Sequence, residues 1–452
     1  MAKPGEYTGD MKQQGISVIV VGAGLAGLSA AAQLRKDGAR VTVIEARRRV
    51  GGRVWTIRGA FAHDQHAEAG GDFIDEGQHE IKRLAAECGL ELHPILRQGF
   101  SFVRQGASMA RRGEGAWNTL ADVLCPLVRA YRLAEERWDS AVAKGLARRS
   151  VARWLDEVKA DGRLRALVRS LRGFFLADPE ELSLLALVDQ LASDVPGREP
   201  MYRIQGGNDR LPYALAASLD ADLHVNTVAR ALRHDRTSVR LTVETPTGES
   251  AQLKADYLIL AVPATTVRSI SIRPALPAEQ SQAIAGLKYG RVTKALLQFD
   301  RPFWRKKGRP RAFGTDAPTG AVWDANEEQR GRAGILTLMA GGQASEDSQK
   351  LVAHEGVEGL VRSLGWLGVG KSRLLHSRIV TWEDDPWVQG GYAYFDPGYD
   401  PSLRQWLARP YGRILFAGEH TSIKWQGYMN GAVESGLRAA AEVCAMASGQ
   451  RA

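Results

Sequence analysis

The chain has 452 residues, 44% of them hydrophobic and 25% charged, and this length and composition suit a globular protein of two domains. Its formal net charge is +9, but Lys and Arg are spread along the chain, and the one compact basic cluster, 301–311, is interpreted as a solvated loop rather than a nucleic-acid site. The three cysteines show neither metal nor disulfide spacing, which favours a reducing, cytoplasmic location.

No targeting or membrane segment is predicted. Residues 1–14 lack the apolar stretch of a secretory signal and are expected to be a flexible N-terminus. No uncharged apolar run approaches the roughly 20 residues that a spanning helix requires. We therefore expect neither a membrane nor a nucleic-acid partner, and the sequence leaves a homodimer open.

The first predicted elements form a nucleotide-binding fingerprint. An apolar strand at 17–21 is followed by Gly22, Gly24 and Gly27 in G-x-G-x-x-G spacing, and an Ala- and Leu-rich helix is expected at 25–36. These glycines permit a tight turn, close approach of a pyrophosphate, and close packing of the helix on the strand. The N-terminal amides of the helix would face the phosphates.

A second strand, at 41–44, ends at Glu45, whose carboxylate can accept hydrogen bonds from ribose hydroxyls. This residue lies 45 − 27 = 18 positions beyond the last glycine, close to the roughly 20 expected of the fingerprint. Strand, glycines, helix, strand and acid in register predict a dinucleotide site. In the following ARRRVGGR, at 46–53, Arg47 or Arg53 is expected to pair with the pyrophosphate.

The middle of the chain is expected to be largely helical. Segments 117–144 and 150–176 carry apolar residues at helical spacing, and a further helix is expected from Asp178 to Leu191. Beyond them, helices are expected at 211–219, 353–364 and 431–447, and strands at 258–263, 291–299, 334–339, 377–382 and 414–417.

One lysine stands on an apolar strand face. In the strand at 291–299, Val292, Lys294 and Leu296 share one side by the period of two. Such a lysine either extends its ammonium to water at the rim of the sheet or lines a polar cavity, and the pattern alone favours the rim.

Several strings resemble known flavoenzymes. VGAGLAGL…VIEARRRVGGR with EAGGDFI, at 68–74, resembles the flavin amine oxidase superfamily, whose members bind FAD. GRVTKALLQFDRPFWRKK, at 290–307, and KWQGYMNGAVESGLRAA, at 424–440, resemble monoamine oxidases closely, and FAGEHT, at 416–421, also occurs in polyamine oxidases and histone lysine demethylases. The resemblance reaches the whole chain and is weakest in the central helical block.

The resemblance implies an α/β fold with a discontinuous, Rossmann-like FAD-binding domain, at 15–97, 201–272 and 388–447. The substrate-binding domain, at 98–200 and 273–387, would be α+β, a mixed sheet with helices. The residues it implies for FAD binding are Gly22, Gly24, Leu25, Ala26, Gly27, Glu45, Ala46, Arg47, Gly52, Arg53, Gly70, Gly71, Asp72, Phe73, Val228, Gly418, Glu419, Gly427, Tyr428, Met429 and Ala432.

The implied activity is FAD-dependent oxidation of an amine to an imine, then an aldehyde or ketone, with O2 reduced to H2O2. The resemblance moves Lys294 from the rim to the cavity, where it would hold a water beside flavin N5, and makes Tyr392 and Tyr428 an aromatic pair that flanks the amine. Gly391 stands where animal monoamine oxidases carry the cysteine that attaches FAD, so FAD is expected to be bound without a covalent link.

Three alternatives remain open at this point. An L-amino-acid oxidase of the same superfamily would need an arginine for the substrate carboxylate, and Arg172 or Arg203 are the candidates. A relative of polyamine oxidases or demethylases is the second alternative, and an FAD-binding protein without turnover is the third. His63 and His66 are interpreted as loop histidines, so no metal site is predicted.

Overall fold

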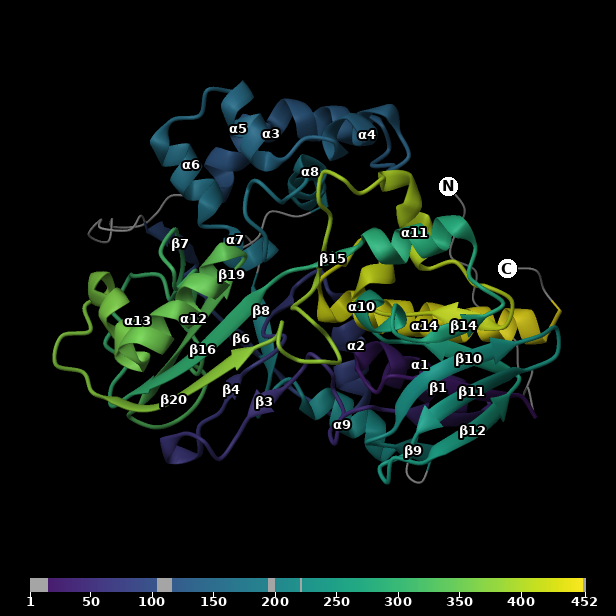
Figure 1. Cartoon of the computed structure of the whole chain (residues 1–452). Helices are drawn as coiled ribbons and strands as arrows, with labels where there is room; N and C mark the ends of the chain where they lie inside the picture. Colours follow the sequence, from purple (N-terminus) through teal and green to yellow (C-terminus); the bar gives the residue numbers. More distant parts are fainter. Residues whose placement is uncertain (1–14, 104–115, 194–199, 220–221, 450–452) are drawn as a thin grey trace.

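The computed structural model describes residues 15–103, 116–193, 200–219 and 222–449, so the N-terminus predicted to be flexible lies outside the described residues. The protein is mixed α/β with several sheets. In Figure 1 a helical block lies across the top, a mixed sheet from the middle of the chain lies at the left, and elements from both ends of the chain lie together at the right.

A five-stranded parallel sheet brings together segments from the whole length of the chain. Val20 pairs with Ile259, and Ile259 pairs with Leu415, so residues almost 400 positions apart share one sheet. The three of its strands at 17–21, 257–260 and 414–416 are almost wholly buried, as their apolar sequences predict. Their order is β22 (Ile414–Phe416), β13 (Tyr257–Leu260), β1 (Ser17–Val21), β2 (Arg40–Ile44) and β9 (Leu223–His224).

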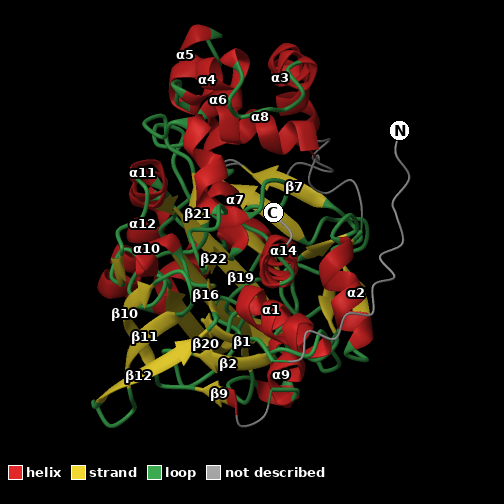
Figure 2. Cartoon of the chain, turned by 90° about the vertical axis from the view of Figure 1, so that its right-hand side faces the viewer, coloured by secondary structure: helices red, strands yellow, loops and turns green. Residues whose placement is uncertain are grey.

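Two helices pack closely beside this sheet. Helix α1 (Leu25–Lys36) and helix α14 (Met429–Ala447) lie side by side in Figure 2. A Cβ on Gly436 would stand 2.1 Å from the Ala26 carbonyl oxygen, so only glycine allows this approach. A Cβ on Gly27 would stand 1.9 Å from the Gly22 carbonyl oxygen, as expected of the third glycine of the fingerprint.

A smaller four-stranded sheet lies beside the parallel one. Its order is β12 (Ser250–Ala255), β11 (Val239–Glu244), β10 (Val228–His234) and β14 (Ser271–Arg273). The sequence analysis did not identify β12, because its polar residues carry little apolar signal. Antiparallel pairing with β11 across six residues makes it a strand.

The mixed sheet of the middle region is buried on both faces where Lys294 stands. Its order is β20 (Leu374–Thr381), β16 (Val292–Phe299), β19 (Gly334–Gly341), β18 (Ala321–Asp324), β17 (Ala312–Thr315) and β7 (Phe100–Val103). All eight residues of β16 are buried, so the rim position that the pattern favoured for Lys294 is wrong. The strand lies between β19 and β20, and neighbouring elements cover both of its faces.

The central block is helical, but its helices are shorter than the periodicity predicted. The two long segments divide into α3 (Ala116–Leu133), α4 (Ala141–Ala147), α5 (Val151–Glu157), α6 (Gly162–Arg169) and α7 (Arg172–Phe175). Ser140, Ser150 and Asp161 each cap the helix that follows with a side-chain oxygen, which explains the breaks. Helix α8 begins at Leu184, after a turn at 178–183, and ends at Ser193.

The remaining elements connect these layers. The predicted helix at 353–364 is two helices, α12 and α13, because Gly356 separates them with a φ of +64°. The connecting elements are β3 (Thr56–Ile57), β4 (Ala67–Glu68), β5 (Ile74–Asp75), α2 (His79–Glu87), β6 (Leu92–Ile95), β8 (Met201–Ile204), α9 (Arg210–Ala217), α10 (Ala264–Val267), α11 (Ala278–Gly286), β15 (Lys288–Tyr289), α12 (Gln343–Glu355), α13 (Val357–Ser363) and β21 (Ala393–Tyr394).

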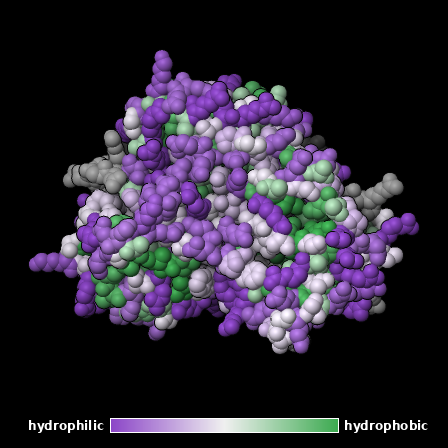
Figure 3. All heavy atoms as spheres, in the orientation of Figure 1, coloured by the Kyte–Doolittle hydropathy of each residue, from purple (hydrophilic) through white to green (hydrophobic). Residues whose placement is uncertain are grey.

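Hydrophilic residues cover most of the face seen in Figure 3, and hydrophobic residues gather in separate areas at the lower left and at the right. Within the described residues, no helix combines the length and the apolar character needed to cross a membrane.

In the basic cluster at 301–311, Arg305 is half-buried and pairs with a buried carboxylate, so the interpretation of the cluster as a solvated loop is only partly right. Arg305 donates to both carboxylate oxygens of Asp324, at 2.6 and 2.8 Å, and Trp304 Nε1 donates to the same carboxylate at 2.9 Å. Asp324 is fully buried, whereas Lys306 and Lys307 are exposed. These contacts therefore hold the cluster against β18.

Asp324→Ala is expected to lower the free energy of unfolding by about 3 kcal/mol, because it leaves the Arg305 guanidinium and the Trp304 N–H without their acceptor. Urea unfolding followed by circular dichroism measures the change. Lys307→Ala, on the exposed side of the same segment, is the control and should leave the midpoint almost unchanged. Equal midpoints for Asp324→Ala and the control would show that this ion pair adds no stability.

Candidate active site

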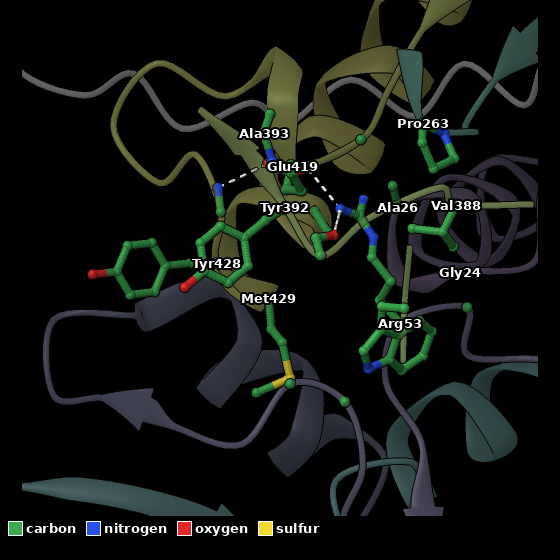
Figure 4. Close-up of a pocket in the computed structure, with 18 of the residues that line it drawn as sticks. Gly24, Ala26, Arg53, Pro263, Val388, Tyr392, Ala393, Glu419, Tyr428 and Met429 are labelled. Carbon is green, nitrogen blue, oxygen red and sulfur yellow. Dashed lines mark hydrogen bonds and ion pairs between the residues drawn. The ribbon is translucent and has the colours of Figure 1, made fainter. Parts of the chain in front are cut away.

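A single cavity of about 400 Å³ collects the residues that the sequence predicts to be functional. Of the predicted residues, Gly27 alone does not line it, because Gly27 packs behind the loop against Gly22. The lining includes Lys294, Tyr392 and Tyr428 as well as residues from both terminal regions of the chain. Figure 4 shows part of this wall, with Gly24, Ala26 and Arg53 on one side and Tyr392, Tyr428 and Met429 on the other.

The glycine loop presents an open cradle to the cavity. Gly22 has a φ of +104°, which favours glycine, and a Cβ there would stand 2.7 Å from the Ala261 carbonyl oxygen. A Cβ on Gly24 would meet nothing within 4 Å, so this position faces free space. The first amides of α1, which have no acceptor within the helix, begin at the same place. These features fit a pyrophosphate.

Glu45 supplies a carboxylate at the end of β2. Its two oxygens accept hydrogen bonds from the Ala23 and Arg47 backbone N–H groups, each at 2.8 Å. Burial raises the pKa of Glu45, and these donors act against that rise. Val228, at the start of β10, lines the cavity beside it, in keeping with an adenosine end of the site.

Both arginines expected at the pyrophosphate line the cavity, and both already hold a carboxylate partner. Arg47 donates to Asp385 at 2.6 Å, and Arg53 donates to Glu419 at 2.8 Å. Their charges are therefore balanced within the protein, which fixes the position of each guanidinium at the cavity wall.

Lys294 lies in a buried ionic network centred on Asp72. Its Nζ donates to the Gly70 carbonyl oxygen at 2.9 Å and to Asp72 Oδ2 at 3.1 Å. Asp72 also accepts from Arg203 Nε at 2.6 Å and from Trp323 Nε1 at 2.9 Å. Lys294 is 2% exposed, so its ammonium is enclosed at the cavity wall.

The charges in this network perturb one another. Burial lowers the pKa of Lys294, and the charge of Asp72 opposes that shift. Burial disfavours ionisation of Asp72, yet the charges of Arg203 and Lys294 hold its pKa below the ordinary value. Burial raises the pKa of the neighbouring Glu68 to about 8, and the charge of Asp72 adds to that rise.

The two tyrosines come from separate loops and meet at the cavity. A Cβ on Gly427, the residue before Tyr428, would stand 3.3 Å from the Tyr392 ring, so the two loops are in contact. The Tyr392 hydroxyl donates to the Phe174 carbonyl oxygen, and the Tyr428 hydroxyl lies 3.4 Å from Gln190 Oε1. Both hydroxyls thus reach the helical block, and burial raises the pKa of Tyr392.

The helical block supplies the wall that sequence reasoning missed. Side chains from α7, α8 and the segment before α4 line the cavity beyond the tyrosines, together with Trp323 of β18. Helical periodicity showed that these segments are amphipathic but not which face lines a cavity. The missed residues are Trp138, Phe174, Phe175, Leu176, Asp189, Gln190, Trp323, Phe395 and Arg404, and Trp382, Trp387 and Trp425 also line the cavity.

The arginines considered for a substrate carboxylate are engaged elsewhere and do not line the cavity. Arg172 pairs with Asp178 at 3.4 Å and donates to the Asp316 carbonyl oxygen. Arg203 serves the Asp72 network. His63 lies in a short 3-10 turn and His66 lies directly before β4, and among the described residues no group of three metal-ligating side chains forms.

Comparison with known proteins identifies the family of the chain. The family model of flavin containing amine oxidoreductases matches residues 25–444. The chain is 32% identical to AofH of Mycobacterium tuberculosis, a protein classed with the flavin-containing monoamine oxidases, over 95% of this chain and 97% of that protein. It is 29% identical to human amine oxidase B, over 94% of this chain and 85% of that protein.

Solved structures show the same fold. Putrescine oxidase bound to putrescine superposes with a TM-score of 0.83 at 25% identity, covering 95% of this chain and 99% of that one. Cyclohexylamine oxidase from Brevibacterium oxydans superposes with a TM-score of 0.84 at 23% identity, covering 96% of this chain and 99% of that one. At this identity the similarity supports a shared fold only. The chain therefore belongs to the flavin-containing amine oxidoreductase family, and it is an FAD-dependent oxidoreductase that acts on amines.

Proposed function

We propose that the protein binds FAD without a covalent link and oxidises monoamines with an apolar body, using O2 as the acceptor and releasing H2O2. One observation carries this proposal: the glycine cradle, Lys294 and the two tyrosines all line one cavity. We also propose the domain division expected from the sequence, with this cavity between the two domains.

Different segments of the cavity wall bind different parts of FAD. The glycine loop and the first turn of α1 hold the pyrophosphate, and Glu45 accepts from the ribose. The N-terminus of α14, where Met429 and Ala432 line the cavity, faces the flavin ring and favours negative charge there. FAD, when bound, takes two electrons from the amine and returns them to oxygen.

The aromatic wall orients the amine and excludes water. Tyr392 and Tyr428 flank the entry to the flavin position, and rings of the helical block and β18 line the space beyond. An apolar wall disfavours the charged form of the amine, so the substrate reacts as the neutral amine. Orientation of its α-carbon and exclusion of water are the contributions of the protein.

The charges of the cavity favour an amine with one nitrogen. Among the described residues, the acidic side chains that line it are Glu45, Asp72, Asp189 and Glu419. Each has a cationic partner, and at the substrate end Asp189 accepts from the Tyr131 hydroxyl at 2.7 Å and lies 3.7 Å from Arg404. A second ammonium would find no unpaired carboxylate there.

The same end does not favour an α-carboxylate. Arg404 lines this wall, but its guanidinium stacks 3.8 Å above the Trp138 ring and donates to the Ile423 carbonyl oxygen. Asp189 lies 3.7 Å from the guanidinium, so the charge of Arg404 is already balanced within the protein. An amino-acid oxidase is therefore the less favoured function.

Anaerobic bleaching of the flavin tests the substrate class. Benzylamine and hexylamine are expected to bleach it at least about tenfold faster, as kcat/KM, than putrescine or L-phenylalanine, a difference of ~1.4 kcal/mol in barrier. A faster reaction with putrescine would favour a polyamine oxidase, and one with L-phenylalanine an amino-acid oxidase. No bleaching by any amine would indicate an FAD protein without turnover.

Acid precipitation of the yellow holoenzyme is expected to release all of its FAD into the supernatant. The reason is that Gly391 occupies the attachment position and that Cys88, Cys125 and Cys444 do not line the cavity. Flavin absorbance that stays with the washed pellet would reveal a covalent bond.

Lys294→Met is expected to keep FAD bound and to slow reoxidation by oxygen at least about tenfold, or ~1.4 kcal/mol of barrier, because it removes a buried positive charge where oxygen gains electrons. Stopped-flow rates of both half-reactions measure this. Lys288→Met, at an exposed lysine of β15, is the control. Unchanged rates in both half-reactions would exclude Lys294 from the chemistry.

Tyr392→Ala and Tyr428→Ala are each expected to slow the limiting rate of anaerobic flavin reduction at least about tenfold, because the amine loses its near-attack orientation. The double variant should lose less reduction rate than the product of the two single effects, since one substitution already opens the slot between the two rings. Phe at either site keeps the ring and most of the rate.

FAD content and unfolding midpoint are measured on the same variants. Ala variants that reduce as fast as the wild type, or that are unfolded and free of flavin, would make these tyrosines packing residues.

A further inference from the structure

One buried carboxylate joins the two loops that carry the tyrosines. Glu419 Oε2 accepts from the Gly427 backbone N–H at 2.8 Å, and Oε1 accepts from the Ala393 backbone N–H at 3.3 Å. Arg53 Nη1 donates to the same Oε1 at 2.8 Å (Figure 4). Three donors from three separate segments therefore meet at one side chain.

The Arg53–Glu419 pair binds backbone groups of residues adjacent to each tyrosine. Arg53 Nη1 also donates to the Gly391 carbonyl oxygen at 2.6 Å, so the ion pair holds the chain both before and after Tyr392. Gly427 directly precedes Tyr428, which is the N-cap of α14. In Figure 4 both tyrosine hydroxyls point away from Arg53 and Glu419, so each ring is held at its base by the carboxylate and at its tip by the helical block.

Burial makes this connection effective. Glu419 is 5% exposed, so its hydrogen bonds compete with little water. Apart from the two-residue strand β21, the loops around Tyr392 and Tyr428 belong to no strand, and regular pairing does not set their separation. The Gly427 backbone lies close to the Tyr392 ring, and its φ of +84° suits glycine, so a small shift of either loop changes the gap between the rings.

We propose that Glu419 is a positioning residue that acts through Tyr392 and Tyr428. With Arg53 it fixes the separation of the two rings and thereby the orientation in which an amine presents its α-carbon. This role goes beyond the contact with FAD expected from the sequence, and it rests on the proposed function of the tyrosines.

Glu419→Gln is the test variant, because it keeps the shape but offers an NH2 group to one of the three donors. Glu442→Gln is the matched control: that carboxylate also pairs with an arginine, Arg438, at 2.9 Å, but it does not line the cavity. Glu419→Asp, which keeps the charge but is one methylene too short to reach all donors, is the second variant.

Hydrogen exchange of the holoenzymes tests the connection itself. Peptides that cover 391–394 and 426–429 are expected to exchange at least about tenfold faster in Glu419→Gln than in the wild type or in Glu442→Gln. Unchanged exchange in both segments would show that Glu419 does not hold the loops and would overturn the proposal.

A mutant cycle tests whether the effect passes through the tyrosines. Glu419→Gln is expected to lower the limiting rate of flavin reduction at least about tenfold in the wild-type background, but less than about twofold in the Tyr392→Ala/Tyr428→Ala background. An equal loss in both backgrounds would mean that Glu419 acts on FAD directly and would overturn the proposal. Loss of FAD from both the Gln and the Asp variant would overturn it in the same way.

The two proposals can fail separately. If the tyrosine variants reduce like the wild type, the proposed aromatic slot is wrong and this inference falls with it. If only the tyrosine variants are slow and Glu419→Gln matches the wild type, the slot stands and the role of Glu419 is wrong.

Discussion

The buried carboxylate of Asp72 is the constraint on which the cavity depends. It lies in the loop after β4 and receives donors from β8, β16 and β18, so one side chain joins the glycine-rich N-terminal region to the mixed sheet. A lysine and an arginine are enclosed with it, and Glu328 supplies a second negative charge at Arg203. Without Asp72 the Lys294 ammonium would be buried without an ion-pair partner, and removing one member of a buried pair costs more stability than the pair contributes.

The lowered pKa of Asp72 makes the stability contributed by this network depend on pH. A carboxylate whose pKa is depressed in the folded state stabilises the protein above its ordinary pKa, and that stability is lost as the pH falls through the folded-state value. The raised pKa of Glu68 has the opposite sign, because its ionised form is disfavoured by folding. At neutral pH, Asp72 is therefore ionised and paired with Lys294 and Arg203, whereas the neighbouring Glu68 carboxyl lies near its pKa.

Pairing would also allow a cavity with many charges to accept the apolar amine proposed as substrate. Arg47, Arg53 and Arg404 each meet a carboxylate across the wall, and Lys294 meets Asp72. The rings between these pairs then present an apolar surface. The two ion pairs therefore differ in what they connect. The Asp72–Lys294 pair joins the N-terminal region to the mixed sheet, and the Glu419–Arg53 pair joins the two tyrosine loops.

Elements whose signals are local could be predicted from the amino-acid sequence alone. The strand, glycines and helix at 17–36, the acid at Glu45 and the C-terminal strand and helix follow from spacing and apolar runs, and the resemblance of whole motifs named their cofactor. Features that depend on contacts between distant residues became visible only in the folded chain. Lys294 is inside because β16 is a central strand, Arg305 is half-buried because it pairs with Asp324, and the long helices break where capping side chains intervene. Local periodicity cannot report which face of a helix meets a cavity, nor which carboxylate meets which cation, because both are set by packing between segments hundreds of residues apart.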